Sequence, residues 1–221
     1  MEDKATRAVR PPVAREGWGY ILGLLLVSGI FFALGWWPAA WGLVFLAGAV
    51  AFFFRDPERR VEAPPGSLLS PADGRVVAAA PEGEGSRVSI FLSLFDVHVN
   101  RSPLAGEVVA ASYRPGRFLP AFRAEASRAN EQNELLLRGE GLEVKVVQVA
   151  GVLARRVVCW VGPGDRVAAG ERIGLIQFGS RVDVHLPPGV ELRVRVGERV
   201  KGGLSVLGQK TPGGGSATAA A

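Results

Sequence analysis

The sequence predicts a mainly β protein: a flattened, barrel-sandwich-like β-sandwich that follows an N-terminal α-helical membrane hairpin. Two long uncharged runs stand close together near the N-terminus. From residue 55 to residue 209, apolar residues alternate over short stretches, which is typical of strands. The 29 Gly and 15 Pro residues separate many of these stretches, as turn residues do. We therefore expect a polar arm over 1–17, the hairpin over 18–54, the β-rich domain over 55–209 and a disordered tail over 210–221.

The two N-terminal runs have the length and flanking residues of a membrane hairpin. Residues 18–37 contain 20 uncharged residues, and residues 39–54, after Pro38, contain 16 more. A helix that spans a bilayer needs about 20 apolar residues. Tryptophans lie near the ends of the runs, and positive residues flank both outer ends, which places these ends in the cytoplasm. We expect a cell-membrane protein whose β-rich domain is cytoplasmic. The shorter second run leaves open whether the hairpin spans the bilayer or only dips into it.

Alternating runs predict the strands of the β-rich domain. Apolar and polar residues alternate over 88–93, 181–186 and 192–197. Residues 157–161 are continuously apolar, which favours a central strand with Cys159 in the core. The one helix expected here covers about 121–130. Beyond Lys210 the chain is Gly, Ser, Thr and Ala with one Pro, which predicts disorder.

The chain also contains an internal repeat. Residues 70–79, SPADGRVVAA, match residues 102–111, SPLAGEVVAA. The shared part predicts a Pro/Gly turn that opens a strand. The second copy has Ala105 where the first has Asp73, so the turn itself does not require the carboxylate.

Composition limits the kinds of site and partner. The net charge of +5 favours an anionic partner. One Cys excludes an internal disulfide framework, and one Cys with two His nearly excludes a structural zinc site, so we expect no metal. Nucleic acid is not expected, because the arginines alternate along strands without aromatic partners for bases.

Two short segments could carry chemistry. If residues 95–100 are extended, Asp96, His98 and Asn100 share a face, where they could orient a proton donor or simply form a polar strand face. The other histidine, His185, is expected to be exposed beside Asp183. Phe178-Gly179-Ser180 interrupts a strand pattern. A bend there would expose the Gly179 carbonyl to the Ser180 hydroxyl. A β-bulge of no chemical consequence fits the same pattern.

Four motifs in a fixed order carry a resemblance to a known family. They are Phe53-Phe54-Arg55-Asp56-Pro57, Ser70-Pro71-Ala72-Asp73-Gly74, Phe95-Asp96-Val97-His98-Val99-Asn100-Arg101-Ser102-Pro103 and Ile176-Gln177-Phe178-Gly179-Ser180-Arg181-Val182. Together they resemble the short, prokaryotic type of phosphatidylserine decarboxylase. The resemblance covers the hairpin and the chain to about Gly208.

The resemblance implies a self-processing lyase of phospholipid biosynthesis that converts phosphatidylserine to phosphatidylethanolamine and carbon dioxide. Ser180 would attack the Gly179 carbonyl, and cleavage would leave a β chain ending at Gly179. The α chain would start at position 180 with a pyruvoyl group, a covalent cofactor that forms a Schiff base with the lipid amine. The two products would form an α/β heterodimer, and a higher oligomer stays open.

The resemblance also implies roles for other residues. Asp73 would orient His98, and His98 would take the Ser180 proton. A second imidazole found in larger relatives has no match here. The proton donor after decarboxylation is therefore open: His98 again, or a water held by Asp96 or Asn100. Substrate-binding residues would be Asp96, Asn100, Arg101 and Phe178.

Other functions remain as alternatives. The substrate could be a related serine phospholipid, archaetidylserine. The glycine-punctuated hairpins also suggest a membrane-tethered biotinyl or lipoyl carrier, but Lys145, Lys201 and Lys210 stand in no Met-Lys-Met or Asp-Lys-Ala setting. A non-catalytic membrane-anchored scaffold would remain one intact chain.

Overall fold

The computed structural model of the chain describes residues 11–119, 129–151, 157–177 and 180–211. The chain divides into two compact units, residues 1–58 and 59–221. Backbone contacts tie the residues just after 54 to the first unit. Arg55 forms an isolated β-bridge with Val13, and the Asp56 amide donates to the Pro12 carbonyl at 2.7 Å.

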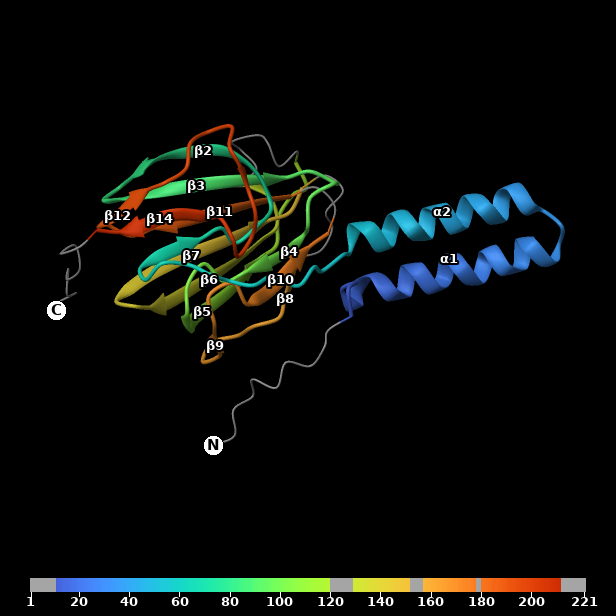
Figure 1. The fold of residues 1–221 in the computed structure, drawn as a ribbon, viewed down its shortest axis with the longest axis horizontal. Helices are drawn as coiled ribbons and strands as arrows, with labels where there is room; N and C mark the ends of the chain where they lie inside the picture. The colour runs from blue at the N-terminus through green and yellow to red at the C-terminus, as the bar shows by residue number, and fades with distance from the viewer. Residues whose placement is uncertain (1–10, 120–128, 152–156, 178–179, 212–221) are drawn as a thin grey trace. The chain divides into compact units, whose positions relative to one another are not determined.

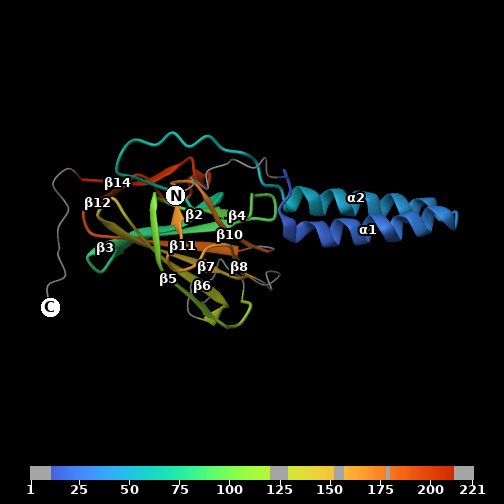
Figure 2. The same ribbon diagram turned by 90° about the horizontal axis from the view of Figure 1, so that it is seen from below.

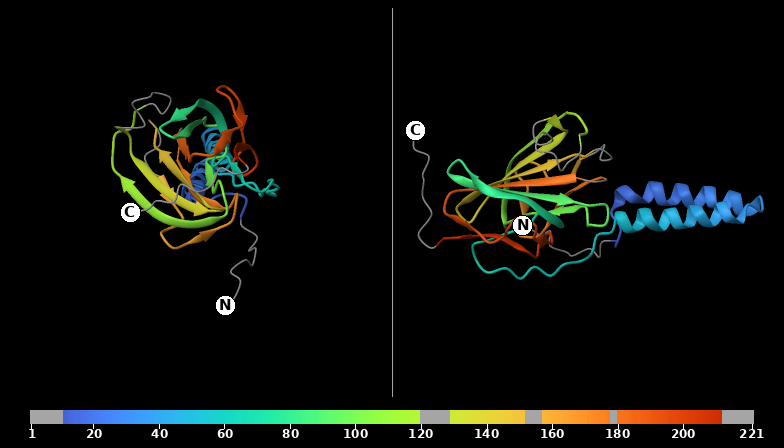
Figure 3. Two further views of the ribbon diagram at one scale, coloured as in Figure 1. Left: turned by 90° about the vertical axis from the view of Figure 1, so that its left-hand side faces the viewer. Right: turned by 90° about the horizontal axis from the view of Figure 1, so that it is seen from above.

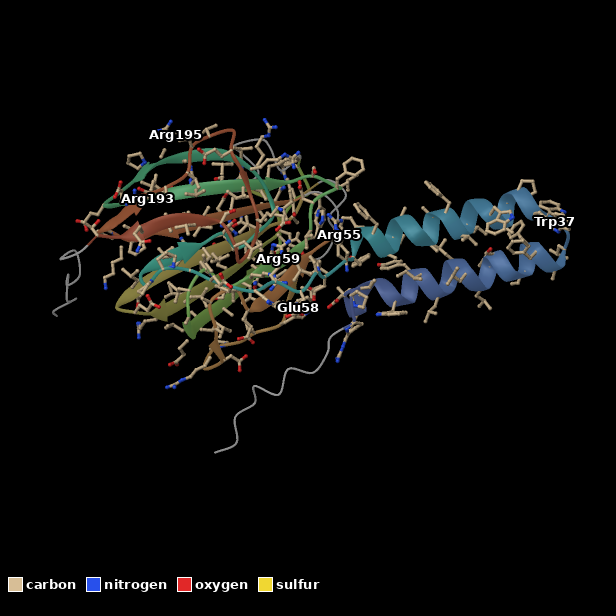
Figure 4. The ribbon with its side chains drawn as sticks, viewed as in Figure 1. Trp37, Arg55, Glu58, Arg59, Arg193 and Arg195 are labelled. Carbon is tan, nitrogen blue, oxygen red and sulfur yellow. The ribbon has the colours of Figure 1, made fainter. Side chains whose placement is uncertain are left out.

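The first unit is the expected helical pair, α1 (Arg15–Ala33) and α2 (Trp37–Phe53). Pro38 lies in the first turn of α2, where its missing N–H breaks no helical hydrogen bond, so it helps to begin the second helix. The Ser28 hydroxyl donates to the Ala40 carbonyl at 2.9 Å and joins the two helices. Figure 4 shows Trp37 at the tip of the pair.

The surface of the helical pair is apolar. Leu26 is 70% exposed and Phe45 81% exposed. By length and composition α1 could cross a membrane, whereas α2 has 17 residues and is shorter. An apolar surface of this extent needs a non-aqueous environment, which agrees with membrane association.

The second unit is built from β-strands, which confirms the mainly β fold class. The strands are β1 (Ser67–Leu69), β2 (Gly74–Glu82), β3 (Gly85–Leu92), β4 (Val99–Arg101), β5 (Gly106–Arg114), β6 (Gln132–Gly139), β7 (Leu142–Val149), β8 (Val157–Cys159), β9 (Arg166–Val167), β10 (Arg172–Ile176), β11 (Ser180–Leu186), β12 (Val190–Leu192), β13 (Arg199–Val200) and β14 (Val206–Lys210).

These strands form three antiparallel sheets (Figures 1 and 2). The largest has eight strands in the order β13-β2-β3-β11-β7-β6-β5-β9, and two smaller sheets have the orders β1-β14-β12 and β4-β10-β8. Figure 3 shows that the large sheet curls into a half-barrel. Alternate residues of its strands fill the inside, so that Ile90, Val146 and Val182 are completely buried. Strand β11 lies at the centre, between β3 and β7.

The internal repeat of the sequence corresponds to two similar turns. The Ser70 hydroxyl donates to the Ala72 carbonyl at 2.7 Å, and the Ser102 hydroxyl donates to the Leu104 carbonyl at 2.6 Å. A glycine opens the following strand in both copies, and a Cβ there would lie 2.1 Å (Gly74) or 2.2 Å (Gly106) from a carbonyl oxygen of the neighbouring strand. The repeated sequence thus encodes a close approach of two backbones, which only glycine permits.

The two copies also bind each other. The Leu69 amide donates to the Pro103 carbonyl at 2.8 Å, and the Arg101 amide donates to the Pro71 carbonyl at 2.8 Å. This reciprocal pair fixes strand β4 against the Pro71 turn. The repeat therefore positions the residues that flank His98.

Several details differ from the sequence-based expectations. Strand β12 ends at Leu192, because residues 195–198 turn back and leave Val196 62% exposed. Strand β8 is an edge strand of its sheet and not a central one, and Cys159 is only half-buried. Strand β14 includes Lys210, the first residue of the expected tail. The expected helix over 121–130 lies outside the described residues except for Ala129 and Asn130.

Candidate active site

Ser180 is the first residue of β11. It pairs with Leu92 at the end of β3 and is completely buried. Within the described part of the chain, its Oγ has no hydrogen-bond partner. A buried polar atom without a partner costs about 1–3 kcal/mol, so this hydroxyl needs an explanation beyond packing. Phe178 and Gly179, which precede it, lie outside the described residues.

His98 is also completely buried. Its Nδ1 lies 2.9 Å from the Asp96 carbonyl oxygen. Because a carbonyl oxygen can only accept, Nδ1 must carry the proton of this hydrogen bond. In the neutral ring the lone pair is then on Nε2, which is the form that a general base requires.

The loop over residues 93–97 brings His98 and Ser180 to the same region. Leu92, which precedes the loop, pairs with Ser180. His98 follows the loop, and its main-chain carbonyl accepts a hydrogen bond from the Ile176 amide at 3.3 Å. The residues at the two ends of this loop therefore contact Ile176 and Ser180. Although Ser180 follows His98 by 82 positions in the sequence, backbone contacts of both residues join the same two parts of the chain.

Asp96 does not share an extended face with His98 and Asn100, which corrects that expectation. Residues 93–96 form a turn in which the Asp96 amide donates to the Ser93 carbonyl at 3.0 Å. The Asp96 carboxylate accepts from the Ser93 amide at 2.8 Å and from its hydroxyl at 2.6 Å. This carboxylate stabilises the loop, and the Asp96 main chain orients His98.

Asn100 begins a buried chain of amides. Its Oδ1 accepts from Gln148 Nε2 at 2.8 Å, and Gln148 Oε1 accepts from Asn133 Nδ2 at 2.9 Å. Gln148 stands opposite Val182, two residues from Ser180, so its side chain and Ser180 lie on the same face of the sheet. Asn100 Nδ2 is buried and has no partner among the described residues, which leaves a free donor on this polar chain.

Asp73 has partners other than the expected His98 imidazole. Its two carboxylate oxygens accept from Arg59 Nη1 at 2.6 Å and Nη2 at 2.8 Å. The Gly202 amide adds a third hydrogen bond at 2.7 Å. The Arg59 and Asp73 side chains are 7% and 13% exposed, so this is a buried, bidentate ion pair. The segments that carry Asp73 and His98 are joined through the backbone by the hydrogen bond from the Arg101 amide to the Pro71 carbonyl.

Two buried arginines flank the site. Arg101 Nη1 donates to the Gly170 carbonyl at 3.0 Å. Arg181, next to Ser180 but on the opposite face of β11, forms an ion pair with Asp183 at 2.9 Å. Burial lowers the pKa of Arg181 and the charge of Asp183 partly opposes this effect. Of the expected substrate-binding residues, Arg101 and Asn100 are thus buried, Asp96 supports the loop, and Phe178 is not described.

Sequence reasoning missed three residues. In the sequence Arg59 is one of the positive residues that follow the second apolar run, and no pattern links it to Asp73. Gln148 and Asn133 lie in strands whose apolar and polar residues alternate. The one sign of their role in the sequence is a polar residue at a position that faces the core. These three residues connect segments far apart in the chain, so local spacing could not identify them.

The three lysines of the carrier alternative differ in position. Lys201 follows β13 and is exposed beside a turn. Lys145 lies within β7 and Lys210 within β14. Lys210 Nζ donates to the Glu140 carbonyl at 2.9 Å.

Comparison with known proteins identifies the family. Residues 46–208 match the family described as phosphatidylserine decarboxylase. The chain is 47% identical over 198 residues to the phosphatidylserine decarboxylase proenzyme of Solibacter usitatus, covering 84% of this chain and 97% of that protein. It is 46% identical to the proenzyme of Symbiobacterium thermophilum (90% and 96% covered) and 43% identical to that of Nitrosomonas eutropha (90% and 95% covered). With a match over most of its length and relatives at this identity, the chain belongs to the phosphatidylserine decarboxylase family.

Proposed function

We propose that the chain is a self-processing proenzyme that becomes a phosphatidylserine decarboxylase, a carboxy-lyase that releases carbon dioxide and phosphatidylethanolamine. The observation that carries this proposal is the buried Ser180 hydroxyl at the start of β11, beside the loop that holds the His98 imidazole. Family membership and the printed name of the relatives, proenzyme, support the same reading.

Self-cleavage would begin at Ser180. His98 Nε2 takes the hydroxyl proton, Oγ attacks the Gly179 carbonyl carbon, and the peptide C–N bond breaks to leave an ester and a free amine. Loss of the Ser180 α-proton then expels the Gly179 carboxylate and leaves dehydroalanine. Addition of water and loss of ammonia convert this residue to a pyruvoyl group at position 180.

The site fits such a group because it is buried and polar on one side. The pyruvoyl group supplies an electron sink for the carbanion that forms as carbon dioxide leaves. Asn100 Nδ2, a buried donor, is suited to hold a carbonyl or carboxylate oxygen. His98, whose Nδ1–H is fixed by Asp96, returns a proton from Nε2 to the substrate carbon. Asp73 supports this arrangement from a distance as a positioning residue.

The two products would remain together without a covalent link. Cleavage before Ser180 would leave β11 to β14 on the small product. These strands pair with β3, β7, β2 and β1 of the large product. The completed sheets therefore favour an α/β heterodimer. The apolar helical pair supports attachment to the cell membrane, and the flanking positive charges favour a cytoplasmic second unit.

Replacement of Ser180 tests the proposal. Wild type should give products 1–179 and 180–221 by intact mass, with a blocked amino terminus on the smaller one. Ser180→Ala should remain one chain with no decarboxylase activity. Ser180→Cys retains a nucleophile and should cleave slowly. An active Ser180→Ala variant would refute the proposal. The same assay with archaetidylserine decides between the two serine phospholipids.

A further inference from the structure

The loop that links Leu92 to His98 exposes apolar side chains beside a buried reactive centre. Phe95 is 78% exposed and Leu94 is 44% exposed, whereas His98, three residues after Phe95, is completely buried. The turn is held by Asp96 through its two bonds to Ser93. A loop that is braced by polar contacts yet points large apolar side chains outward is suited to contact another apolar phase.

Two arginines lie against this loop. Arg199 on β13 stands directly opposite Arg75 on β2, and both are exposed. Arg199 Nη1 also lies 3.4 Å from Asp96 Oδ1, which places the arginine pair next to the loop. Like charges directly opposite each other destabilise a sheet. The arginine pair therefore does not stabilise the fold, and binding an anionic ligand would explain it better.

We propose that Leu94, Phe95, Arg75 and Arg199 form a membrane-contact rim that seats the active site on an anionic phospholipid bilayer. The proposal rests on the proposed function, because a decarboxylase of phosphatidylserine must meet its substrate where the acyl chains remain in lipid. Leu94 and Phe95 would insert at the headgroup level, and the two arginines would bind lipid phosphates. None of these four residues belongs to the helical pair.

The chemistry of the rim favours a lipid surface over a protein partner. It combines two arginines at paired positions of neighbouring strands with an apolar tip, which matches the phosphate and acyl layers of a bilayer. It also adjoins the segment that carries Ser180, so a serine headgroup would reach the site while its lipid stays in the bilayer. Arginine is suited to this role because its planar group binds phosphate with two hydrogen bonds.

Depth-dependent fluorescence quenching tests the contact directly. The full chain, carrying Cys159→Ser and Leu94→Cys labelled with an NBD fluorophore, is reconstituted in vesicles of phosphatidylcholine and phosphatidylglycerol. The matched control carries the label at Glu84→Cys, in the turn at the other end of β3. We expect doxyl-labelled lipid to quench the label at position 94 and not at 84, and aqueous iodide to do the reverse. Quenching at 94 by iodide alone overturns the proposal.

A second variant separates the rim from the chemistry. In Leu94→Ser/Phe95→Ser the full chain should cleave itself normally, because self-cleavage uses no lipid. Its rate on phosphatidylserine vesicles should fall by about tenfold, since two apolar side chains no longer enter the bilayer. Its rate on monomeric short-chain phosphatidylserine should match wild type. A wild-type rate on vesicles overturns the rim, whereas a wild type that neither cleaves nor decarboxylates overturns the proposed function instead.

Discussion

At the scale of single residues, the site depends on which atoms hold each side chain. His98 receives its orientation from a main-chain carbonyl, a partner that no substitution at Asp96 removes directly. Asp73 is bound to Arg59, with both groups out of water. The printed hydrogen bonds of His98 and of Asp73 go to different partners, so the two residues should respond differently to replacement.

Replacement of His98 should stop self-cleavage while leaving the fold intact. His98→Gln keeps a polar group of similar reach but has no basic nitrogen, so Ser180 should not be activated. Intact mass should show one full-length chain after incubation, and thermal unfolding should stay close to that of Ser180→Ala. Complete cleavage of His98→Gln would exclude the imidazole as the base. Cleavage without decarboxylation would assign it to proton return alone.

Replacement of Asp73 should cost stability as well as processing. Asp73→Ala leaves the Arg59 guanidinium buried without its carboxylate, and breaking such a pair typically costs about 3–5 kcal/mol. The matched control is Arg59→Met/Asp73→Leu, which removes both charges and should recover most of the lost free energy of unfolding in denaturant titrations. An Asp73→Ala variant as stable as wild type would show that the pair is energetically unimportant.

The amide chain offers a third residue-scale prediction. Gln148→Leu removes the partners of both Asn100 Oδ1 and Asn133 Nδ2, and each unsatisfied group costs about 1–3 kcal/mol. We expect a clear loss of unfolding free energy and slower decarboxylation, because Asn100 loses its anchor. Gln148→Glu, which retains acceptor oxygens, should keep the bond to Asn133 and lose the one to Asn100. Equal unfolding free energies and decarboxylation rates of the two variants would contradict these separate roles of the two hydrogen bonds.

At the scale of elements, alternation and turn residues predicted much of the fold. The strands around residues 88–92 and 181–186 could be predicted because their apolar residues alternate. In the structure these apolar residues pack into the core. The alternation over 192–197 predicted a strand that ends at Leu192 in the structure, because Val196 is an exposed turn residue. The shared face of Asp96 and His98 failed for a local reason: a carboxylate three residues after Ser93 forms a turn that competes with the extended chain.

The pH response of the sheet can be predicted at His185, which joins three strands. Its Nδ1 contacts Glu82 on β2 at 2.6 Å, and Lys145 stands opposite on β7. Burial, and then the charge of Lys145, lower its pKa below 6.5, while Glu82 opposes the shift. The unfolded chain therefore binds a proton more readily.

Folding stability should accordingly fall as the pH drops through 6.5, and this loss should level off below the lowered pKa of His185 in the folded state. Above pH 7, where the ring is neutral in both states, the contribution vanishes. His185→Gln cannot titrate and should reduce this slope. Denaturant titrations of both proteins from pH 5 to pH 8 measure the difference, and parallel curves would refute the assignment.

At the scale of the whole molecule, the apolar helical pair lies in the first unit and the candidate active site lies in the second. The second unit has its own core and contains Ser180, His98, Asp73 and Arg59. The helical pair contributes none of these side chains. Removal of the first unit should therefore weaken membrane attachment and spare self-cleavage, provided that the boundary keeps the ion pair of Asp73.

Two truncations that differ by two residues test this boundary. A chain of residues 58–221 retains Arg59, so it should fold, cleave itself and release from membranes more readily than the full chain. A chain of residues 60–221 lacks Arg59 and leaves Asp73 buried with only the Gly202 amide as its partner among the bonds described above. It should lose about as much unfolding free energy as the charge-breaking variants, about 3–5 kcal/mol, and process poorly. Circular dichroism, intact mass and vesicle flotation measure the three properties. If both truncations behave alike, Arg59 does not define the start of the folded unit; if residues 58–221 fail to fold while Ser180→Ala of the full chain folds, the second unit depends on the helices after all.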